Sequence, residues 1–223
     1  MGDPSMRSTA IKRIASLTLA VIGVITMTGC TATEPAPSGQ PLFDEAEANY
    51  LRYRGFVNDL QSTLSTDAWT IGQIGVYGMQ PVECDANQYR FDLNRSIALD
   101  GTQREEYADT VETFFTGHDM SPRRSVLGRD DQEGQLIQIT VRDQGDFSLL
   151  LVEIRRDGQL RIAAETTCWP GDRNELSRLI FHGERLGEGY LPIDTESPTD
   201  PLFFGITPGD PQFVRESSPT PAP

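Results

Sequence analysis

Two histidines are the first residues to consider for catalysis, because imidazole exchanges protons near neutral pH. His118 is followed by Asp119, and an imidazole beside a carboxylate is a common acid–base unit. Adjacent residues seldom face each other, however, so His118 is better explained as the solvated end of a helix. His182 stands between Phe181 and Gly183 and is interpreted as a surface or packing residue. A hydrolase that uses His118 is therefore the least favoured function.

Metal binding is the second chemistry to test. A calcium loop needs converging carboxylates and a glycine, and the run Asp130-Asp131-Gln132-Glu133-Gly134 meets this only in part, so it is interpreted as a solvated acidic loop. Zinc is disfavoured because neither histidine lies at a metal-binding spacing from a cysteine. The chain also lacks Gly-x-Ser-x-Gly, His-Glu-x-x-His, Walker, Cys-x-x-Cys and EF-hand motifs. We expect no cofactor, no metal and no enzymatic activity.

The first cysteine, Cys30, ends a segment with the order of an export signal. Basic residues come first, an apolar run follows over residues 14–25, and the small residues Thr28 and Gly29 precede the cysteine. The apolar run is too short to cross a hydrocarbon core of about 30 Å. We expect residues 1–29 to be removed and Cys30 to carry a lipid that holds the chain on the extracytoplasmic side of the cell membrane. The alternative is a plain signal peptide with an incidental cysteine.

The other two cysteines, Cys84 and Cys168, form an even pair. In an exported chain such a pair is expected to be a disulfide. The closed loop would contribute about 4 to 5 kcal/mol on the chain-entropy account, an upper figure because strain is ignored.

The charge of the mature chain limits its partners. Removing residues 1–29 takes away three of the 19 basic residues and one of the 33 acids, which leaves 16 arginines, 32 acids and a net charge of −16. Such a surface repels nucleic acid and anionic lipid head groups, so we expect no nucleic-acid partner. Because Lys12 is the only lysine, the mature chain has none, which excludes Schiff-base chemistry and a phosphate-loop lysine.

Composition divides the mature chain into three parts. Residues 30–42 contain proline and small polar residues and are expected to be a flexible tether, while residues 43–190 form one folded domain. The Pro-rich residues 191–223 are expected to be largely disordered. An apolar island within this tail either straps onto the domain, which is favoured, or binds a partner; it consists of Leu202, Phe203, Phe204 and Ile206.

The first half of the domain alternates helix and strand patterns. A stripe at steps of three and four predicts a helix from Phe43 to Leu64. An irregular strand follows over residues 70–77, and a half-buried strand over residues 89–93. The pattern Thr102-x-x-Glu105 resembles a capping box and predicts a second helix, which ends at Gly117.

The second half of the domain reads as a β meander. Strand patterns occur at residues 125–127, 137–141, 147–154 and 160–164, separated by the turn sequences Asp143–Asp146 and Arg156–Gln159. The run from Ser148 to Ile154 is apolar on nearly both faces and is expected to be central. We therefore predict an α+β fold in which an antiparallel meander sheet of about five strands packs two helices on one face.

These features resemble the LppA-type lipoproteins of mycobacteria and related actinobacteria, over about residues 27–170. The resemblance is carried by a lipobox ending at Cys30, a helix leading to Trp69, Cys84 followed by Tyr89-x-Phe91, and Thr166-Thr167-Cys168. It implies a fold and a membrane location but no catalytic residues. The acidic, Pro-rich tail has no counterpart in it.

Three functions are compatible with this pattern. The favoured one is a non-enzymatic, membrane-tethered domain that binds a protein or a cell-envelope component through an aromatic and acidic face. The second is a carrier or sensor of a small apolar or cationic ligand, which predicts a pocket lined by Tyr50, Phe91 and Phe114. The third, the hydrolase, predicts that His118 lies in a cleft beside a carboxylate of raised pKa.

Overall fold

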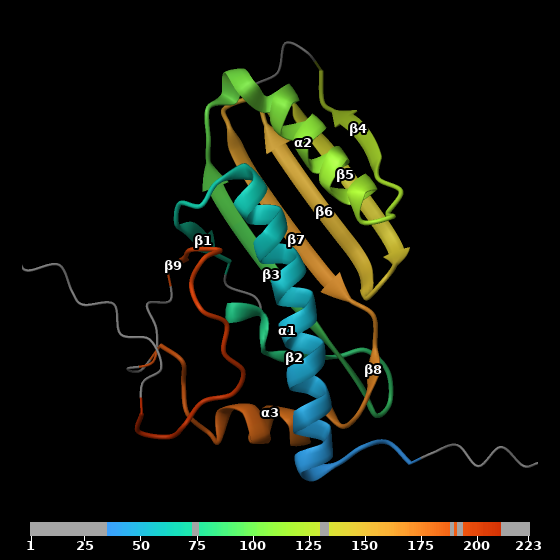
Figure 1. Ribbon diagram of the computed structural model, residues 1–223, viewed down its shortest axis with the longest axis vertical. Helices are drawn as coiled ribbons and strands as arrows, with labels where there is room; N and C mark the ends of the chain where they lie inside the picture. Colours follow the sequence, from blue (N-terminus) through green and yellow to red (C-terminus); the bar gives the residue numbers. More distant parts are fainter. Residues whose placement is uncertain (1–34, 73–75, 130–133, 188–189, 191–193, 211–223) are drawn as a thin grey trace, which may run out of the picture. The chain divides into compact units, whose positions relative to one another are not determined.

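The computed structural model describes residues 35–72, 76–129, 134–187, 190 and 194–210. In this part of the chain, three helices pack with an antiparallel sheet (Figure 1). The helices are α1 (Gly39–Leu64), α2 (Arg104–Gly117) and α3 (Arg173–Phe181), and short 3-10 segments span Val76–Gly78 and Gly101–Gln103. The α+β class predicted from the sequence is confirmed, with one helix more than expected.

The sheet is built from a meander with further strands added at one end. Its strands are β1 (Trp69–Ile71), β2 (Pro81–Glu83), β3 (Gln88–Ala98), β4 (Arg123–Leu127), β5 (Leu136–Gln144), β6 (Phe147–Arg155), β7 (Gln159–Thr166), β8 (Trp169–Pro170) and β9 (Thr195–Glu196). The order is β4-β5-β6-β7-β3-β1-β9, and β2 and β8 pair with the first half of β3. The predicted meander is confirmed, although β7 rather than β6 lies in the middle of this order.

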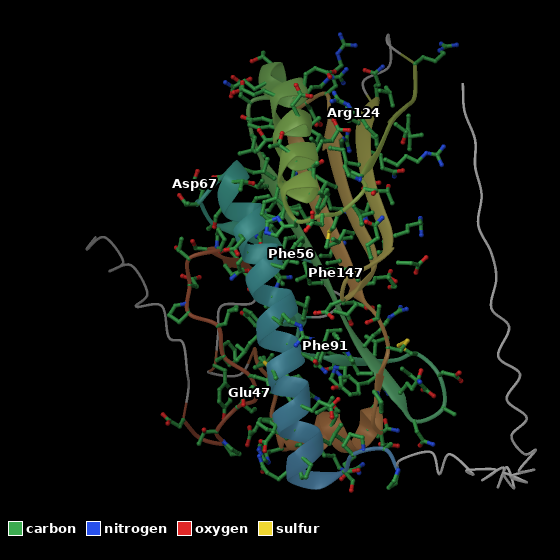
Figure 2. The ribbon with its side chains drawn as sticks, turned by 45° about the vertical axis from the view of Figure 1, so that its right-hand side comes forward. Glu47, Phe56, Asp67, Phe91, Arg124 and Phe147 are labelled. Carbon is green, nitrogen blue, oxygen red and sulfur yellow. A yellow bond between two sulfur atoms is a disulfide. The ribbon has the colours of Figure 1, made fainter. Side chains whose placement is uncertain are left out.

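One face of the sheet is covered by α1 and α2, and no helix of the described chain covers the opposite face, called the open face below (Figure 1). Strands β5, β6 and β7 bury every second residue under the helices, as the alternating sequence predicts. Phe56 of α1 and Phe147 of β6 meet in this layer, with ring centroids 5.0 Å apart (Figure 2). Residues of opposite parity in the same strands lie on the open face and are only partly buried.

Helix α1 begins four residues before the predicted start. Leu42, which was assigned to the tether, is fully buried, and the backbone N–H of Gly39 donates to Glu175 of α3 over 2.8 Å. The apolar stripe predicts the helix itself. Its first turn, however, depends on a contact with a helix more than 130 residues away, which the local pattern does not contain.

The start of α2 differs from the predicted capping box. Asp100 caps the 3-10 turn that precedes α2: its carboxylate accepts from the backbone N–H and the hydroxyl of Thr102, at 2.9 Å and 2.7 Å. After this turn, α2 begins at Arg104 and ends at Gly117 as predicted. The aspartate takes this role because a side-chain carboxylate accepts from backbone N–H two residues on.

Helix α3 was not predicted from the sequence. Asp172 caps it by accepting from the N–H of Glu175 over 2.7 Å, and Leu176 and Ile180 are fully buried. Leu176, Leu179 and Ile180 follow helical spacing, but nine residues make only about two and a half turns, which is shorter than the window in which periodicity identifies a helix. The strand expected over residues 70–77 is also shorter, since only β1 and the 3-10 segment are formed among its described residues.

The apolar island of the C-terminal segment packs onto the domain, which confirms the strap interpretation. Phe204 and Ile206 are 9% and 5% exposed, and the N–H of Ile206 donates to the carbonyl of Ile180 over 2.9 Å. Earlier in the same segment, β9 pairs with β1. Residues 194–206 are thus part of the folded unit rather than of a disordered tail.

The disulfide between Cys84 and Cys168 is formed, with a Cα–Cα distance of 6.0 Å. It joins the β2–β3 connection to the β7–β8 connection, so it holds β2 and β8 on either side of β3. Beside it, Trp169 is half-buried and contacts Tyr89 and Phe91. The predicted disulfide is confirmed.

Candidate functional site: a cationic groove on the open face of the sheet

His118 lies at the C-terminal end of α2, exposed to solvent. Its Nδ1 is 2.8 Å from the carbonyl oxygen of Phe114, and its ring packs on Phe114 and Phe56, with centroid distances of 4.3 Å and 5.1 Å. This is the helix-end position predicted as the simpler explanation. Among the described residues, no carboxylate forms an ion pair or hydrogen bond with His118, so the acid–base unit that the hydrolase needs is not formed there.

The remaining groups considered for chemistry do not assemble into a site. His182 is exposed and occupies the left-handed position that ends α3, with φ of 50°. The run at residues 130–133 and the lipidation residue Cys30 lie outside the described residues. Among described residues, no three metal-ligating side chains converge, and no helix has the length and apolar character needed to cross a bilayer.

The pocket expected for a carrier is not formed by the three aromatic residues that were to line it. Tyr50 and Phe91 are almost fully buried with ring centroids 5.9 Å apart, and Phe204 fills the space beside both. Phe114 belongs to a separate group, where it contacts Phe56 over 5.2 Å. Most of the aromatic side chains therefore belong to the core. They do not form the aromatic contact surface that was expected from the sequence.

The expected acidic face is also partly neutralised within the domain. Arg124 of β4 points toward α2 and pairs with Glu105, Asp109 and Glu112; the ion pairs to Asp109 and Glu112 span 2.7 Å and 3.1 Å (Figure 2). One guanidinium thus contacts the acids of three successive turns of α2. Desolvation of Arg124 lowers its pKa, but these carboxylates raise it overall, so the cation stays charged.

A groove on the open face is the strongest candidate for a binding site. It has a volume of about 500 Å³ and lies between the edge strand β4 and its neighbour β5. Every second residue from Ser121 to Leu127 lines one side, and every second residue from Gln138 to Gln144 lines the other. Period-two geometry explains the arrangement, since alternate residues of paired strands share one face. The described residues of the lining are hydroxyls, amides, one leucine and two arginines, and none of these eight is acidic.

The two arginines of this groove, Arg123 and Arg142, are exposed and make no ion pair within the described chain. Arg123 lies opposite Thr140 in the register of β4 and β5. The groove's amides are already positioned: Gln144 accepts from the N–H of Ser121 over 2.8 Å, and Gln138 donates to Glu153 of β6 over 3.3 Å.

The other charges of the open face are matched with one another. Arg90 pairs with Asp92 over 3.1 Å and with Glu165 over 3.5 Å, and Arg161 pairs with Glu153 over 3.5 Å. Burial raises the pKa of Asp92 above its ordinary value, which Arg90 only partly offsets. The acids of this face are thus occupied by other arginines, and the uncompensated positive charge lies in the groove.

Such a set of groups is suited to recognition of an anion. A guanidinium presents parallel N–H donors that match a carboxylate or a phosphate, and hydroxyl and amide side chains add hydrogen bonds to a sugar or peptide. Sequence reasoning missed this site. The available signal was that polar residues alternate with apolar core positions in two neighbouring strands. These polar residues can be recognised as a site only when it is known which face of the sheet the helices leave uncovered.

Comparisons with known proteins add no relative from which a function could be transferred. No family model, no curated protein and no solved structure matches the chain. The similarity to LppA-type lipoproteins therefore stays a prediction that rests on the residues given above.

Proposed function

We propose that this chain is a lipid-anchored, non-catalytic binding domain on the extracytoplasmic side of the membrane. In this proposal it holds an anionic component of the cell envelope in the groove between β4 and β5. The observation that carries the proposal is the pair Arg123 and Arg142, exposed and unpaired among hydroxyl and amide side chains. The preferred ligand is a glycan that bears phosphate or carboxylate groups, since such a polymer offers both the anion and the hydroxyls that this lining complements.

The negative net charge of the chain opposes this attraction at long range. A net charge of −14 for the full sequence opposes the approach of any long polyanion. At physiological salt, however, charges separated by more than about 8 Å are largely screened. A ligand that follows the open face is therefore governed by the nearby arginines, whereas the acids of α2 lie on the other side of the sheet. Binding should weaken as the salt concentration rises.

The experiment is sedimentation of the ectodomain with purified bacterial cell wall, before and after its phosphate- and carboxylate-bearing polymers are removed. We expect binding to untreated wall only, and a loss of at least about tenfold in the double variant Arg123→Gln/Arg142→Gln, since a charge-assisted hydrogen bond contributes about 1.5 to 3 kcal/mol. The matched control is Arg155→Gln, an open-face arginine that already pairs with Asp157 over 3.3 Å. Equal binding by the double variant and the wild type would contradict the proposal.

The membrane anchor is a separate part of the proposal and has its own test. The order of basic, apolar and small residues before Cys30 supports lipidation, and the disulfide is compatible with an oxidising compartment. In cells that express the full chain, we expect Cys30→Ala to move the protein from the membrane fraction to the soluble extracytoplasmic fraction. Retention of this variant in the membrane would refute the anchor.

A protein partner is the second candidate, and the edge strand β4 favours it. Val126 and Leu127 are 53% and 45% exposed on this strand, and an edge strand offers backbone groups to a strand from another chain. Val126→Lys would block such pairing while it leaves the groove arginines in place. Loss of a captured partner in this variant, with wall binding retained, would support this candidate over the glycan.

A further inference from the structure

Two arginines are buried in the core beneath α1, at the end of the sheet formed by β3, β1 and β9. Arg54 of α1 is 2% exposed and Arg95 of β3 is fully buried. A guanidinium removed from water is strongly destabilising unless it is paired and hydrogen-bonded. The surroundings of these two cations therefore have to supply negative charge.

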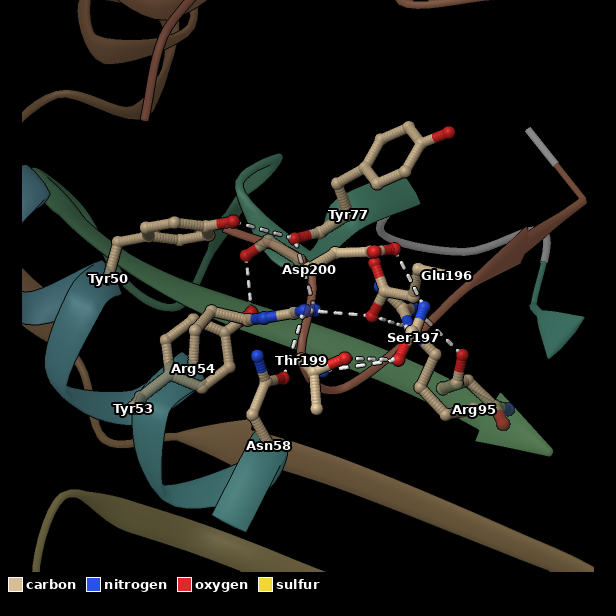
Figure 3. A network of polar contacts seen from close by, with 12 residues as sticks. Tyr50, Tyr53, Arg54, Asn58, Tyr77, Arg95, Glu196, Ser197, Thr199 and Asp200 are labelled. Carbon is tan, nitrogen blue, oxygen red and sulfur yellow. Dashed lines mark hydrogen bonds and ion pairs between the residues drawn. The ribbon is translucent and has the colours of Figure 1, made fainter. Parts of the chain in front are cut away.

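The negative charge comes from the C-terminal segment, in the form of Glu196 of β9 (Figure 3). Its Oε1 accepts from Arg54 Nη2 over 2.8 Å and from Arg95 Nε over 2.6 Å. Burial alone would raise the pKa of Glu196, but the two guanidinium groups overcome this and hold it below its ordinary value. One carboxylate thus stands between two cations, which leaves one positive charge uncompensated within this group of three.

The site offers more hydrogen-bonding capacity than Glu196 uses. Both arginines donate to the same carboxylate oxygen, although a guanidinium and a carboxylate can pair through two parallel bonds. Nε of Arg54 and Nη2 of Arg95 are buried without a partner. Asn58, one turn after Arg54 on α1, accepts from Arg54 Nη2 over 3.2 Å. One turn further along α1, Gln61 is fully buried and has neither amide atom paired. These groups favour a site for a polar guest over a closed structural ion pair, because unpaired buried groups are costly.

Glu196 reaches this site in the way that a bound peptide would. Its two-residue strand is added to the edge of β1, with Trp69 opposite Glu196. The N–H of Ile71 donates to the carbonyl of Asp194 over 3.0 Å, which continues the pairing. Strand addition supplies backbone hydrogen bonds while a side chain enters a pocket, a common mode of peptide recognition.

We propose that Arg54 and Arg95 form a carboxylate-binding site of this domain, which Glu196 fills as an intramolecular ligand. Its two cations belong to α1 and β3, so neither comes from the segment that fills the site. Its ligand class is a carboxylate, either free or on an acidic peptide, that competes with Glu196. This site lies on the helix-covered side of the sheet, so it is distinct from the groove between β4 and β5 and does not depend on the proposed function.

The test is to remove the internal ligand and supply an external one. In the exported chain from residue 31 onward, Glu196→Ala vacates the carboxylate position, and acetate is the probe at pH 7 against chloride at equal ionic strength. We expect acetate to raise the unfolding temperature of this variant by a few degrees in a saturable manner, and to leave the wild type unchanged. If Glu196→Ala does not fold in chloride, the same site predicts that acetate restores its refolding.

Two further variants make the result specific. Glu153→Ala removes a carboxylate that pairs with Arg161 at the surface, and acetate should have no effect on it. Arg95→Leu combined with Glu196→Ala should lose the response to acetate. The inference is overturned if acetate neither stabilises nor refolds Glu196→Ala, or if the response persists without Arg95.

Discussion

Arg123 and Arg124 are neighbours in the chain but belong to opposite faces of β4. Arg124 faces α2 and contacts three acids, whereas Arg123 faces the open side and lines the groove without an ion pair. Identical side chains therefore have a structural role in one case and a proposed binding role in the other. The difference comes from the alternation of strand residues and from the helices, which cover only one face.

Asp92 on the same open face gives a prediction at the level of a single residue. Burial raises its pKa, so the folded state binds the proton more tightly than the unfolded chain does. Its charged form then costs stability, and this cost develops as the pH rises from the ordinary aspartate value through the raised one. We expect Asp92→Asn to stabilise the domain at pH 7 by a few tenths of a kcal/mol, because solvent screening reduces the effect.

The measurement is urea unfolding of wild type and Asp92→Asn at pH 7 and at pH 3. The gain should be present at pH 7 and disappear at pH 3, where the wild-type aspartate is itself protonated. A variant that is less stable than the wild type at pH 7 would show that the ion pair with Arg90 outweighs the cost of burial.

At the level of elements, the C-terminal segment contributes to the core as a helix or strand would. Phe204 contacts Phe43 and Tyr50, with ring centroids 5.1 Å apart in each case, and Phe91 at 5.9 Å. The neighbouring Phe203 is only half-buried and contacts Tyr77 over 6.2 Å. The segment is therefore held at two points: by β9, which pairs with β1, and by the ring of Phe204, which lies among three other aromatic rings.

These two phenylalanines give a matched pair of variants. We expect Phe204→Ala to lower the free energy of unfolding by about 2 to 4 kcal/mol, because it leaves a cavity among fixed rings, and Phe203→Ala to lower it by less than about 1.5 kcal/mol. Chemical denaturation followed by tyrosine and tryptophan fluorescence measures both. Equal small losses would mean that the segment lies on the domain without stabilising it.

The elements that the sequence predicts are those whose signal is local and periodic. Helix α1 and the strands from β4 to β7 follow from apolar spacing alone. By contrast, β9 is two residues long and exists only because it pairs with β1, and α3 has nine residues, too few for its apolar spacing to identify a helix. One informative signal was present and unused: Arg95 occupies a core position in the alternation of β3, where a charge needs a buried partner. Its partner, Glu196, lies 101 residues away.

Charge is distributed unevenly over the two faces of the sheet. The outward positions of β3 to β7 carry five arginines against three acids, in a chain whose net charge is −14. The helix-covered side carries acidic residues of α2 that Arg124 partly neutralises. This separation gives the domain one side suited to an anion and one suited to water.

The disulfide gives the prediction that concerns the whole molecule. Cys84 and Cys168 are separated by 84 residues, so the bond restricts the unfolded chain over nearly half of the described domain. We expect the double variant Cys84→Ala/Cys168→Ala to lose about 2 to 5 kcal/mol of stability. The loss should be reproduced when the wild-type chain from residue 31 onward is unfolded in a reducing agent, since both treatments remove the same constraint.

The size of this loss also bears on where the protein can work. A domain of this size is typically stable by about 5 to 15 kcal/mol, so a loss in this range leaves a much larger unfolded fraction. Urea unfolding of the oxidised, reduced and double-variant forms measures it directly. A large loss of stability means that the fold depends on an oxidising compartment, as is expected of an exported protein. Identical midpoints for the three forms would mean that the packing of β2 and β8 on β3 suffices, and the bond would then give no reason to place the domain outside the cytoplasm.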